Sequence, residues 1–202
     1  MNSKVTILIL AAGSSSRMGK IKQLLPWKDS TLLEHAIKIA KLSKASEVLV
    51  VLGSNAKLIK ENIKTDNVSF LENTNWELGL GTSISCGVNF LMHNNKDTDA
   101  ILVLLADQAL IDTEYLNEMI DRFTSNKIDL IATRYGDKIG VPALFKQIYF
   151  TDLQNLDGDQ GAQLLLKKFE DKVVSMNPVG KTFDVDTLVD YNKLLRMYDN
   201  KP

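Results

Sequence analysis

Short apolar runs alternate with amphipathic stretches along most of the chain. The first run, residues 5–10, is almost continuously apolar and rich in β-branched side chains, which is typical of a strand buried on both faces of a sheet. Thr31 and Glu34 have the spacing of a capping box, which predicts the start of a helix that continues to about Lys41. The chain therefore begins as strand, loop and helix, in an alternating pattern.

The alternation continues through the sequence, although it is less regular in the second half. Further strands are predicted at residues 47–52, 68–71, 100–105, 130–133, 140–145, 173–176 and 181–185. Further helices are predicted at residues 56–63, 82–93, 112–124, 146–156, 161–169 and from Asp186 or Thr187 to about Met197. This order predicts an α/β fold with a mainly parallel sheet and helices on both faces, built as one domain over residues 1–202.

Residues 100–105 form the most hydrophobic predicted strand, which we expect near the centre of the sheet. In open α/β sheets, ligands bind beyond the carboxyl ends of the strands. A ligand site is therefore expected among the segments that follow strands, at residues 11–22, 73–85, 107–110 and 184–190.

Charge, cysteine content and hydrophobicity limit which classes of partner and environment the protein suits. The formal net charge is −1, which argues against a nucleic acid partner, because such proteins usually carry a basic footprint. The single cysteine, Cys86, excludes an internal disulfide and a cysteine-rich zinc site. The longest apolar run, residues 100–106, is far shorter than the roughly 18 residues that cross a bilayer. We expect a cytoplasmic protein, since cleavage of residues 5–12 as a signal peptide would remove the first core strand.

The most distinctive segment, residues 10–26, follows the first strand and reads LAAGSSSRMGKIKQLLP. Gly13 and Gly19 allow the backbone to come close to a ligand, and serines with backbone N–H groups suit phosphate oxygens. Arg17, Lys20 and Lys22 supply positive charge beside them. This chemistry suits a triphosphate.

Two familiar phosphate-binding loops do not fit this segment. The dinucleotide fingerprint requires G-x-G-x-x-G, but Ser15 stands where the second glycine belongs. The P-loop ends in Gly-Lys followed by Ser or Thr, but Ile21 follows Gly19 and Lys20, and Ser14 stands where its first glycine belongs.

The segment instead resembles the L-A-A-G-x-S-x-R-M-G-x-x-K-x-L-L-P signature of the MobA-like nucleotidyltransferases, especially the molybdenum cofactor cytidylyltransferase branch. That resemblance covers nearly the whole chain and implies a Rossmann-like fold of the nucleotide-diphospho-sugar transferase type. It implies that this loop binds the nucleotide, through Ala11, Ala12, Gly13, Ser14, Gly19 and Lys22. Arg17 and Lys22 are then the catalytic cations.

Three later segments match further motifs of the same family. Residues 79–83 resemble its base-binding G-x-G-x-S segment, which implies nucleotide binding by Gly79, Gly81, Thr82 and Ser83. Residues 104–108 resemble its L-A-D-Q-P motif, which implies that Asp107 is catalytic and binds Mg²⁺; Ala109 replaces the usual proline.

The third motif lies near the end of the chain, where residues 184–191 resemble D-I-D-T-P-E-D-Y. Asp186 is favoured as the second metal ligand and Asp184 comes next, although Asp186 would also suit the N-cap of the last helix. Leu188 and Val189 depart from the motif.

The acceptor side is less well defined by the sequence. Residues 140–145 and 156–162 resemble family segments on that side of the cleft, and Val141 stands where a polar residue is common. Trp27 and Trp76 suit either packing or stacking on a ring system.

The resemblance implies transfer of a nucleoside monophosphate to a phosphate acceptor with release of pyrophosphate. Ala12 favours CTP, since the guanylyl branch has glycine there, and molybdopterin is then the expected acceptor. A molybdoenzyme or its chaperone is a further possible partner. The alternatives are guanylyl transfer, transfer to a sugar or alcohol phosphate, and a non-catalytic nucleotide-binding accessory protein for molybdoenzyme maturation.

Overall fold

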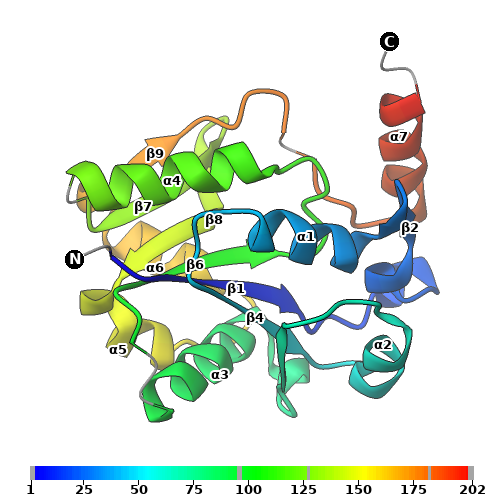
Figure 1. The fold of residues 1–202 in the computed structure, drawn as a ribbon, viewed down its shortest axis with the longest axis horizontal. Helices are drawn as coiled ribbons and strands as arrows, with labels where there is room; N and C mark the ends of the chain where they lie inside the picture. The colour runs from blue at the N-terminus through cyan, green and yellow to red at the C-terminus, as the bar shows by residue number, and fades with distance from the viewer. Residues whose placement is uncertain (1–2, 95–96, 127, 182, 200–202) are drawn as a thin grey trace.

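Seven strands form the main sheet, in the order β5-β4-β1-β6-β8-β7-β9 (Figure 1). The structure is a computed structural model that describes residues 3–94, 97–126, 128–181 and 183–199. The strands of this sheet are β1 (Val5–Ala11), β4 (Glu47–Leu52), β5 (Ser69–Glu72), β6 (Ala100–Leu105), β7 (Leu130–Tyr135), β8 (Lys138–Lys146) and β9 (Val174–Met176).

Parallel pairing dominates the sheet. Strand β1 pairs in parallel with β4 and with β6, and β4 pairs in parallel with β5. Strand β8 runs antiparallel to both of its neighbours, β6 and β7, while β9 returns parallel to β7. The predicted mainly parallel sheet is therefore confirmed, and β6 lies inside it as its hydrophobicity predicted.

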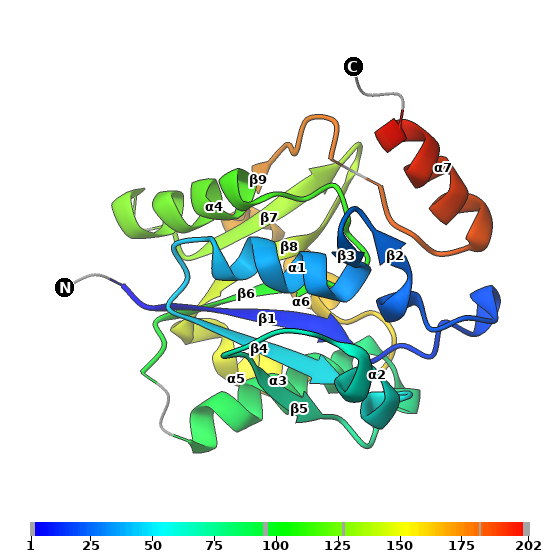
Figure 2. The same ribbon diagram turned by 45° about the vertical axis from the view of Figure 1, so that its right-hand side comes forward.

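Helices cover both faces of the sheet. They are α1 (Leu32–Lys41), α2 (Ala56–Asn62), α3 (Leu80–His93), α4 (Thr113–Asn126), α5 (Phe150–Gln154), α6 (Ala162–Lys168) and α7 (Leu188–Asp199). Every residue of β1 is buried, because its alternate side chains feed two cores. Ile7 and Ile9 pack with α1, α2 and α4, whereas Leu8 and Leu10 pack with α3, α5 and α6. Figure 2 shows α1 and α4 on one side of the sheet and α3 and α5 on the other. In the described residues, no helix is long and apolar enough to cross a membrane.

Local sequence signals fix the starts of two of these helices. The Glu34 N–H donates to Thr31 Oγ1 over 3.3 Å and the Thr31 N–H donates to Glu34 Oε2 over 2.9 Å, which confirms the capping box of α1. Helix α7 begins in the same way, because the Asp190 N–H donates to Thr187 Oγ1 over 3.2 Å and the Thr187 N–H donates to Asp190 Oδ2 over 3.0 Å. Thr187 therefore caps α7, which leaves the Asp186 carboxylate available for another role.

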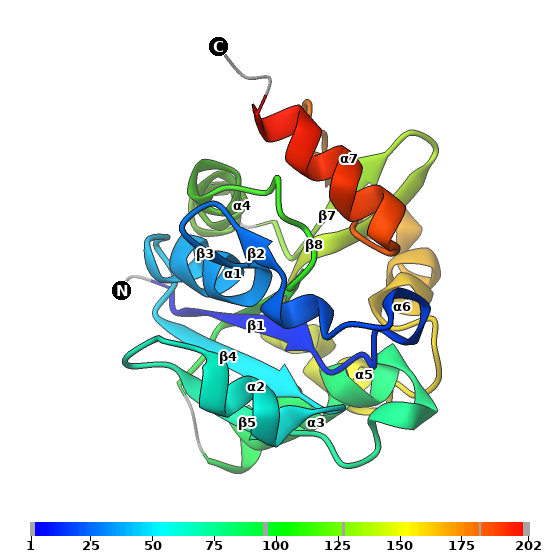
Figure 3. The same ribbon diagram turned by 90° about the vertical axis from the view of Figure 1, so that its right-hand side faces the viewer.

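A third apolar cluster joins α7 to the rest of the molecule. Trp27, in the short β2 (Pro26–Trp27) that pairs with β3 (Ser30–Thr31), is 1% exposed and packs with Val185 and Leu194. The Trp27 ring centroid lies 5.3 Å from that of Tyr198, so this tryptophan serves packing. Figure 3 shows α7 standing at the edge of the molecule, beside β2.

Two predicted elements in the second half are wrong. The predicted helix at 146–156 is divided, since Lys146 ends β8 and a 3-10 turn at Gln147–Tyr149 precedes the short α5. Lys181 and residues 183–185 form no strand, and Thr182 lies outside the described residues. Phe183 and Val185 are apolar because they pack in the cluster around Trp27, not because they extend the sheet.

Candidate active site

Two adjoining pockets open beyond the carboxyl ends of β1 and β6. The first has a volume of about 380 Å³ and is lined by Ala12, Gly13, Ser14, Ser15, Ser16, Lys22, Trp76, Glu77, Gly79, Leu80, Ser83, Asp159 and Asp186. The second has a volume of about 330 Å³ and is lined by Leu10, Ala11, Ala12, Gly13, Lys22, Gln23, Leu80, Leu105, Ala106, Asp107 and Asp186. The site thus lies at the sheet edge that the topology favours for ligands.

The first loop is held in shape by a glutamine. Gln23 is 4% exposed, and its Nε2 donates to the carbonyl oxygens of Ala11 over 2.8 Å and Gly13 over 3.0 Å. Ser15 adopts a left-handed conformation, with φ 56°, and its Oγ accepts the Lys22 N–H over 3.2 Å. Gln23 was not among the predicted site residues, although a polar residue before two leucines was a possible signal.

A lysine lies between two carboxylates at the junction of the pockets. The Lys22 Nζ is 2.5 Å from Asp107 Oδ2 and 3.7 Å from Asp186 Oδ1. The Lys22 and Asp107 side chains are only 19% and 15% exposed, so water screens this pair weakly. Asp107 Oδ1 is buried and has no hydrogen-bond partner among the described residues.

Asp184 occupies a different place from Asp186. The pKa of Asp184 is raised, first by desolvation and then by repulsion from Asp107, while a hydrogen bond from Gln108 opposes the shift. Asp186 lines both pockets, whereas Asp184 lines neither of the two. The two carboxylates were predicted as alternatives; Asp184 is close enough to Asp107 to be repelled by it, and Asp186 shares the lining of the second pocket with Asp107.

Gln108, which the prediction did not include, anchors the turn that carries Asp107. It is 5% exposed, and its Nε2 donates over 2.9 Å to both the Tyr135 hydroxyl and the Val141 carbonyl oxygen. The Tyr135 hydroxyl donates to the same carbonyl. Burial and the negative charge of Asp184 raise the pKa of Tyr135, so this hydroxyl remains a hydrogen-bond donor.

Only some residues of the glycine segment at the start of α3, residues 79–83, line the first pocket. Gly79 and Ser83 line it, but Gly81 and Thr82 do not. The Thr82 hydroxyl donates to the Gly79 carbonyl over 2.8 Å, and Asn73 Nδ2 donates to the Thr82 and Ser83 hydroxyls over 3.0 Å each. Nucleotide binding by these residues stays a prediction.

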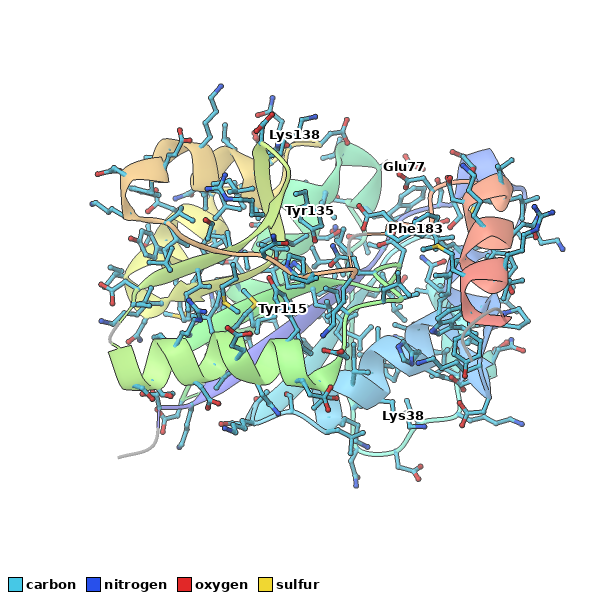
Figure 4. All side chains as sticks on the ribbon, turned by 90° about the horizontal axis from the view of Figure 1, so that it is seen from above. Lys38, Glu77, Tyr115, Tyr135, Lys138 and Phe183 are labelled. Atoms are coloured by element: carbon cyan, nitrogen blue, oxygen red, sulfur yellow. The ribbon has the colours of Figure 1, made fainter. Side chains whose placement is uncertain are left out.

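Gly19 and Arg17 lie in the turn that closes the first loop. Gly19, with φ 61°, ends the 3-10 turn Ser16–Met18, and a left-handed conformation there favours glycine. The structure describes the backbone of Arg17 but not its side chain, so its catalytic role stays a prediction. Trp76, Glu77 and Asp159 also line the pocket; they lie in the segments 73–85 and 156–162 that were expected at the cleft, although only Trp76 was considered individually, for stacking or packing. Figure 4 labels Glu77 towards the end of the molecule that carries α7.

A mainly parallel sheet whose first loop surrounds a pocket with serines and a lysine, opposite aspartates from two later segments, is the architecture of a nucleotidyltransferase. Residues 7–173 match the MobA-like NTP transferase domain, and the chain belongs to this family. Its fold is that of the nucleotide-diphospho-sugar transferases, as the resemblance implied.

Relatives of known sequence and structure agree with this assignment. The chain is 28% identical to the purine catabolism protein PucB of Bacillus subtilis over 200 residues, covering 94% of this chain and 95% of PucB. The crystal structure of an Rv0371c homologue from Mycobacterium sp. strain JC1 superposes with a TM-score of 0.83 at 28% identity, covering 98% of both chains. The Rv0371c complex with manganese from Mycobacterium tuberculosis has a TM-score of 0.77 at 25% identity, covering 97% of this chain and 100% of that one. By contrast, the chain spans only 35% of the bifunctional protein GlmU of Pseudomonas aeruginosa, to which it is 25% identical.

Proposed function

We propose that this protein transfers CMP from CTP to a phosphate group of molybdopterin, with Mg²⁺, and releases pyrophosphate. The observation that carries the proposal is the position of Lys22 and Asp107, 2.5 Å apart, beside a pocket lined by the loop from Ala12 to Ser16. That loop offers backbone N–H groups and serine hydroxyls to phosphate oxygens, which is the environment that a triphosphate requires.

The aspartates fit a divalent cation. Asp107 Oδ1 is a buried carboxylate oxygen without a partner among the described residues, and such an oxygen is costly unless a cation or donor satisfies it. Mg²⁺ prefers one or two carboxylates together with phosphate oxygens and waters. The described residues contain no group of three or more acidic, histidine or cysteine side chains arranged for a metal, so phosphate oxygens and waters would have to supply the remaining ligands. Asp107 and Asp186 would hold the ion, and the manganese complex of the related Rv0371c supports a divalent metal.

When bound, Mg²⁺ supplies positive charge that neutralises the phosphate oxygens and orients the leaving group. The residues of the chain position the reactants. The loop held by Gln23 binds the outer phosphates, and Lys22 exchanges its contact with Asp107 for the triphosphate as this ligand enters. Arg17 adds a second cation at the same loop.

The proposed transfer requires no side chain to remove a proton from the acceptor phosphate. An oxygen of the acceptor phosphate forms a bond to the α-phosphorus as the bond between that phosphorus and the bridging oxygen to the β-phosphate breaks. The electron pair leaves with pyrophosphate. A phosphate monoester is substantially ionised near pH 7, so positioning and charge stabilisation carry the catalysis.

CTP is proposed over GTP on the identity of Ala12. This residue is 6% exposed and lines both pockets, so its methyl group contributes to the shape of the nucleotide site. The acceptor is proposed from the resemblance to the cytidylyltransferase branch, and a molybdoenzyme or its chaperone would then take up the product.

Pyrophosphate release tests the proposal. Purified protein, Mg²⁺ and molybdopterin are combined with CTP, GTP, ATP or UTP, and parallel reactions contain sugar and alcohol phosphates as acceptors. Asp107→Ala is the inactive variant, and Asp121→Ala, which removes an exposed carboxylate paired with Lys44, is the matched control. We expect release with CTP and molybdopterin, lost only in Asp107→Ala.

The other outcomes identify what fails. A preference for GTP would preserve the mechanism and overturn the argument from Ala12. Release of pyrophosphate only with a sugar or alcohol phosphate would identify that compound, and not molybdopterin, as the acceptor. Clear CTP binding without release in any reaction would favour the accessory protein over the enzyme.

A further inference from the structure

The loop between α5 and α6 packs directly on the glycine segment that opens α3. A Cβ atom on Gly81 would lie 2.3 Å from the carbonyl oxygen of Asp157, and one on Gly79 would lie 2.3 Å from the carbonyl carbon of Gly158. The Gly81 N–H donates to the Gly158 carbonyl over 2.8 Å. Protein packing therefore explains both glycines, since no side chain fits where the two backbones meet.

The same loop is held at both of its ends. Upstream, the Ser85 hydroxyl donates to the Gln154 carbonyl over 2.5 Å, and Gln154 Nε2 donates to Asn89 Oδ1 over 2.8 Å. Downstream, Gly161 lies against Leu80, because a Cβ there would come within 3.0 Å of Leu80 Cδ2. The position of residues 157–159 is consequently fixed by α3, and this loop places Asp159 in the lining of the first pocket.

Asp159 is one of three acidic residues that line the first pocket, with Glu77 and Asp186. Asp159 is exposed, and its carboxylate has no hydrogen-bond or ion-pair partner among the described side chains. An ionised carboxylate accepts hydrogen bonds only, and beside phosphate groups it would repel the ligand. Its presence is favourable where the ligand offers an N–H or O–H group, which a nucleoside does and a triphosphate tail does not. The segment 156–162 was expected on the acceptor side, but Asp159 shares its pocket with Gly79 and Ser83 of the segment that resembles the base-binding motif, which favours the nucleoside.

We propose that Asp159 is a specificity-determining residue that accepts a hydrogen bond from the nucleoside part of the substrate. The donor is an amino group of the base or a hydroxyl of the ribose. This inference rests on the proposed binding of a nucleoside triphosphate. It assigns a role in selecting that nucleotide to the loop at residues 157–159, which packs against Gly79 and Gly81.

Calorimetric titration of the full chain with triphosphates in the presence of Mg²⁺ tests the inference. The ligands are CTP, UTP, which lacks the amino group, and 2′-deoxy- and 3′-deoxy-CTP. The variants are Asp159→Ala and the matched control Asp157→Ala, which removes an exposed carboxylate from the same loop that does not line the pocket. If the pyrophosphate assay shows that another triphosphate is the substrate, that triphosphate and its deamino and deoxy analogues replace CTP, UTP and the deoxy-CTP analogues in the titration.

We expect Asp159→Ala to raise the Kd of CTP by about tenfold to a hundredfold, the value of a hydrogen bond to a charged group. The Kd of the one analogue that lacks the donor should be high in the wild type and unchanged by the substitution. A wild-type Kd raised only for UTP, relative to CTP, identifies the base amine as the donor, and one raised only for a deoxy analogue identifies that hydroxyl. Asp157→Ala should leave all of these Kd values unchanged.

Three outcomes would overturn the inference while leaving the proposed function in place. Tighter binding of every triphosphate by Asp159→Ala would show that the carboxylate only repels phosphate. Equal weakening of all four ligands would indicate a metal or structural role, and unchanged Kd values would show no contact. Wild-type protein that binds no triphosphate at all would instead overturn the proposed function, and this inference with it.

Discussion

The Lys22 Nζ lies between two carboxylates, 2.5 Å from Asp107 Oδ2 and 3.7 Å from Asp186 Oδ1. These three side chains come from the first loop, the turn after β6 and the segment before α7. The lysine thus neutralises charge on the carboxylates that we propose for Mg²⁺. The Lys22 ammonium and Mg²⁺ would therefore compete for the carboxylate oxygens of Asp107 and Asp186, and this competition can be measured.

Lys22→Met should separate metal binding from catalysis. The substitution keeps much of the side-chain length and removes the charge, so Mn²⁺ should bind the nucleotide-free protein about tenfold more tightly. Nucleotidyl transfer should nevertheless fall by about a hundredfold or more, because a cation for the phosphate oxygens is lost. Electron paramagnetic resonance of free Mn²⁺ and pyrophosphate release measure the two effects. Lys20→Met, at an exposed lysine of the same loop, is the control for Mn²⁺ affinity alone; equal Mn²⁺ affinity in both variants would contradict the competition.

Asp186 and Asp184 should differ in their effect on the metal requirement. Asp186 lines both pockets and faces Lys22, so Asp186→Asn should raise the Mg²⁺ concentration for half-maximal transfer by about tenfold or more. Asp184→Asn should change it less, since Asp184 lines neither pocket. A Mg²⁺ titration of transfer at saturating triphosphate compares them. Helix α7 should persist in Asp186→Asn, because Thr187 supplies the cap, and a larger effect at Asp184 would reverse the assignment.

Two glycine substitutions should distinguish binding from packing. A Cβ on Gly13 meets no atom within 4 Å, so Gly13→Ala should leave the melting temperature almost unchanged and weaken triphosphate binding by filling the pocket. Gly81→Ala should destabilise the fold by roughly 1–3 kcal/mol, because its methyl group collides with the Asp157 carbonyl. Thermal denaturation followed by circular dichroism, with CTP titration of each variant, checks this. Equal melting temperatures would mean that the loop at 157–159 moves away without cost.

His35 should make the free energy of unfolding depend on pH. Burial, with the positive charge of Lys28, lowers the pKa of His35 to about 4, from 6.5 in an ordinary histidine. Between these values the unfolded chain binds more protons, so stability rises with pH across this window. The contribution of His35 to the free energy of unfolding is fully present above about pH 6.5. It decreases by roughly 3 kcal/mol as the pH falls to about 4.

Urea denaturation at several pH values between 4 and 7 measures this dependence. His35→Gln should flatten the curve, and His93→Gln, at an exposed histidine of α3, should not alter it. Parallel curves for the wild type and His35→Gln would show that other groups control stability in this window.

The sequence by itself determined the elements whose signals are local. The apolar run of β1 and the Thr31–Glu34 capping box each depend on neighbouring residues, and both formed as predicted. The first-loop motif is a contiguous segment, and together with the later motifs it indicated the family that the comparison of residues 7–173 shows. One of the two wrong elements arose because apolar residues that are buried outside the sheet resemble a strand, as at Phe183 and Val185, whose side chains pack around Trp27.

Only the tertiary structure decided which distant side chains meet. Lys22 and Asp107 are 85 positions apart, and nothing local indicates that they form an ion pair. Gln108 became an anchor because β8 brings the Val141 carbonyl beside it, and Gly81 admits a loop that begins at Asp157. Spacing along the chain encodes helices, strands and caps, whereas contacts between segments depend on how the packed sheet brings its loops together.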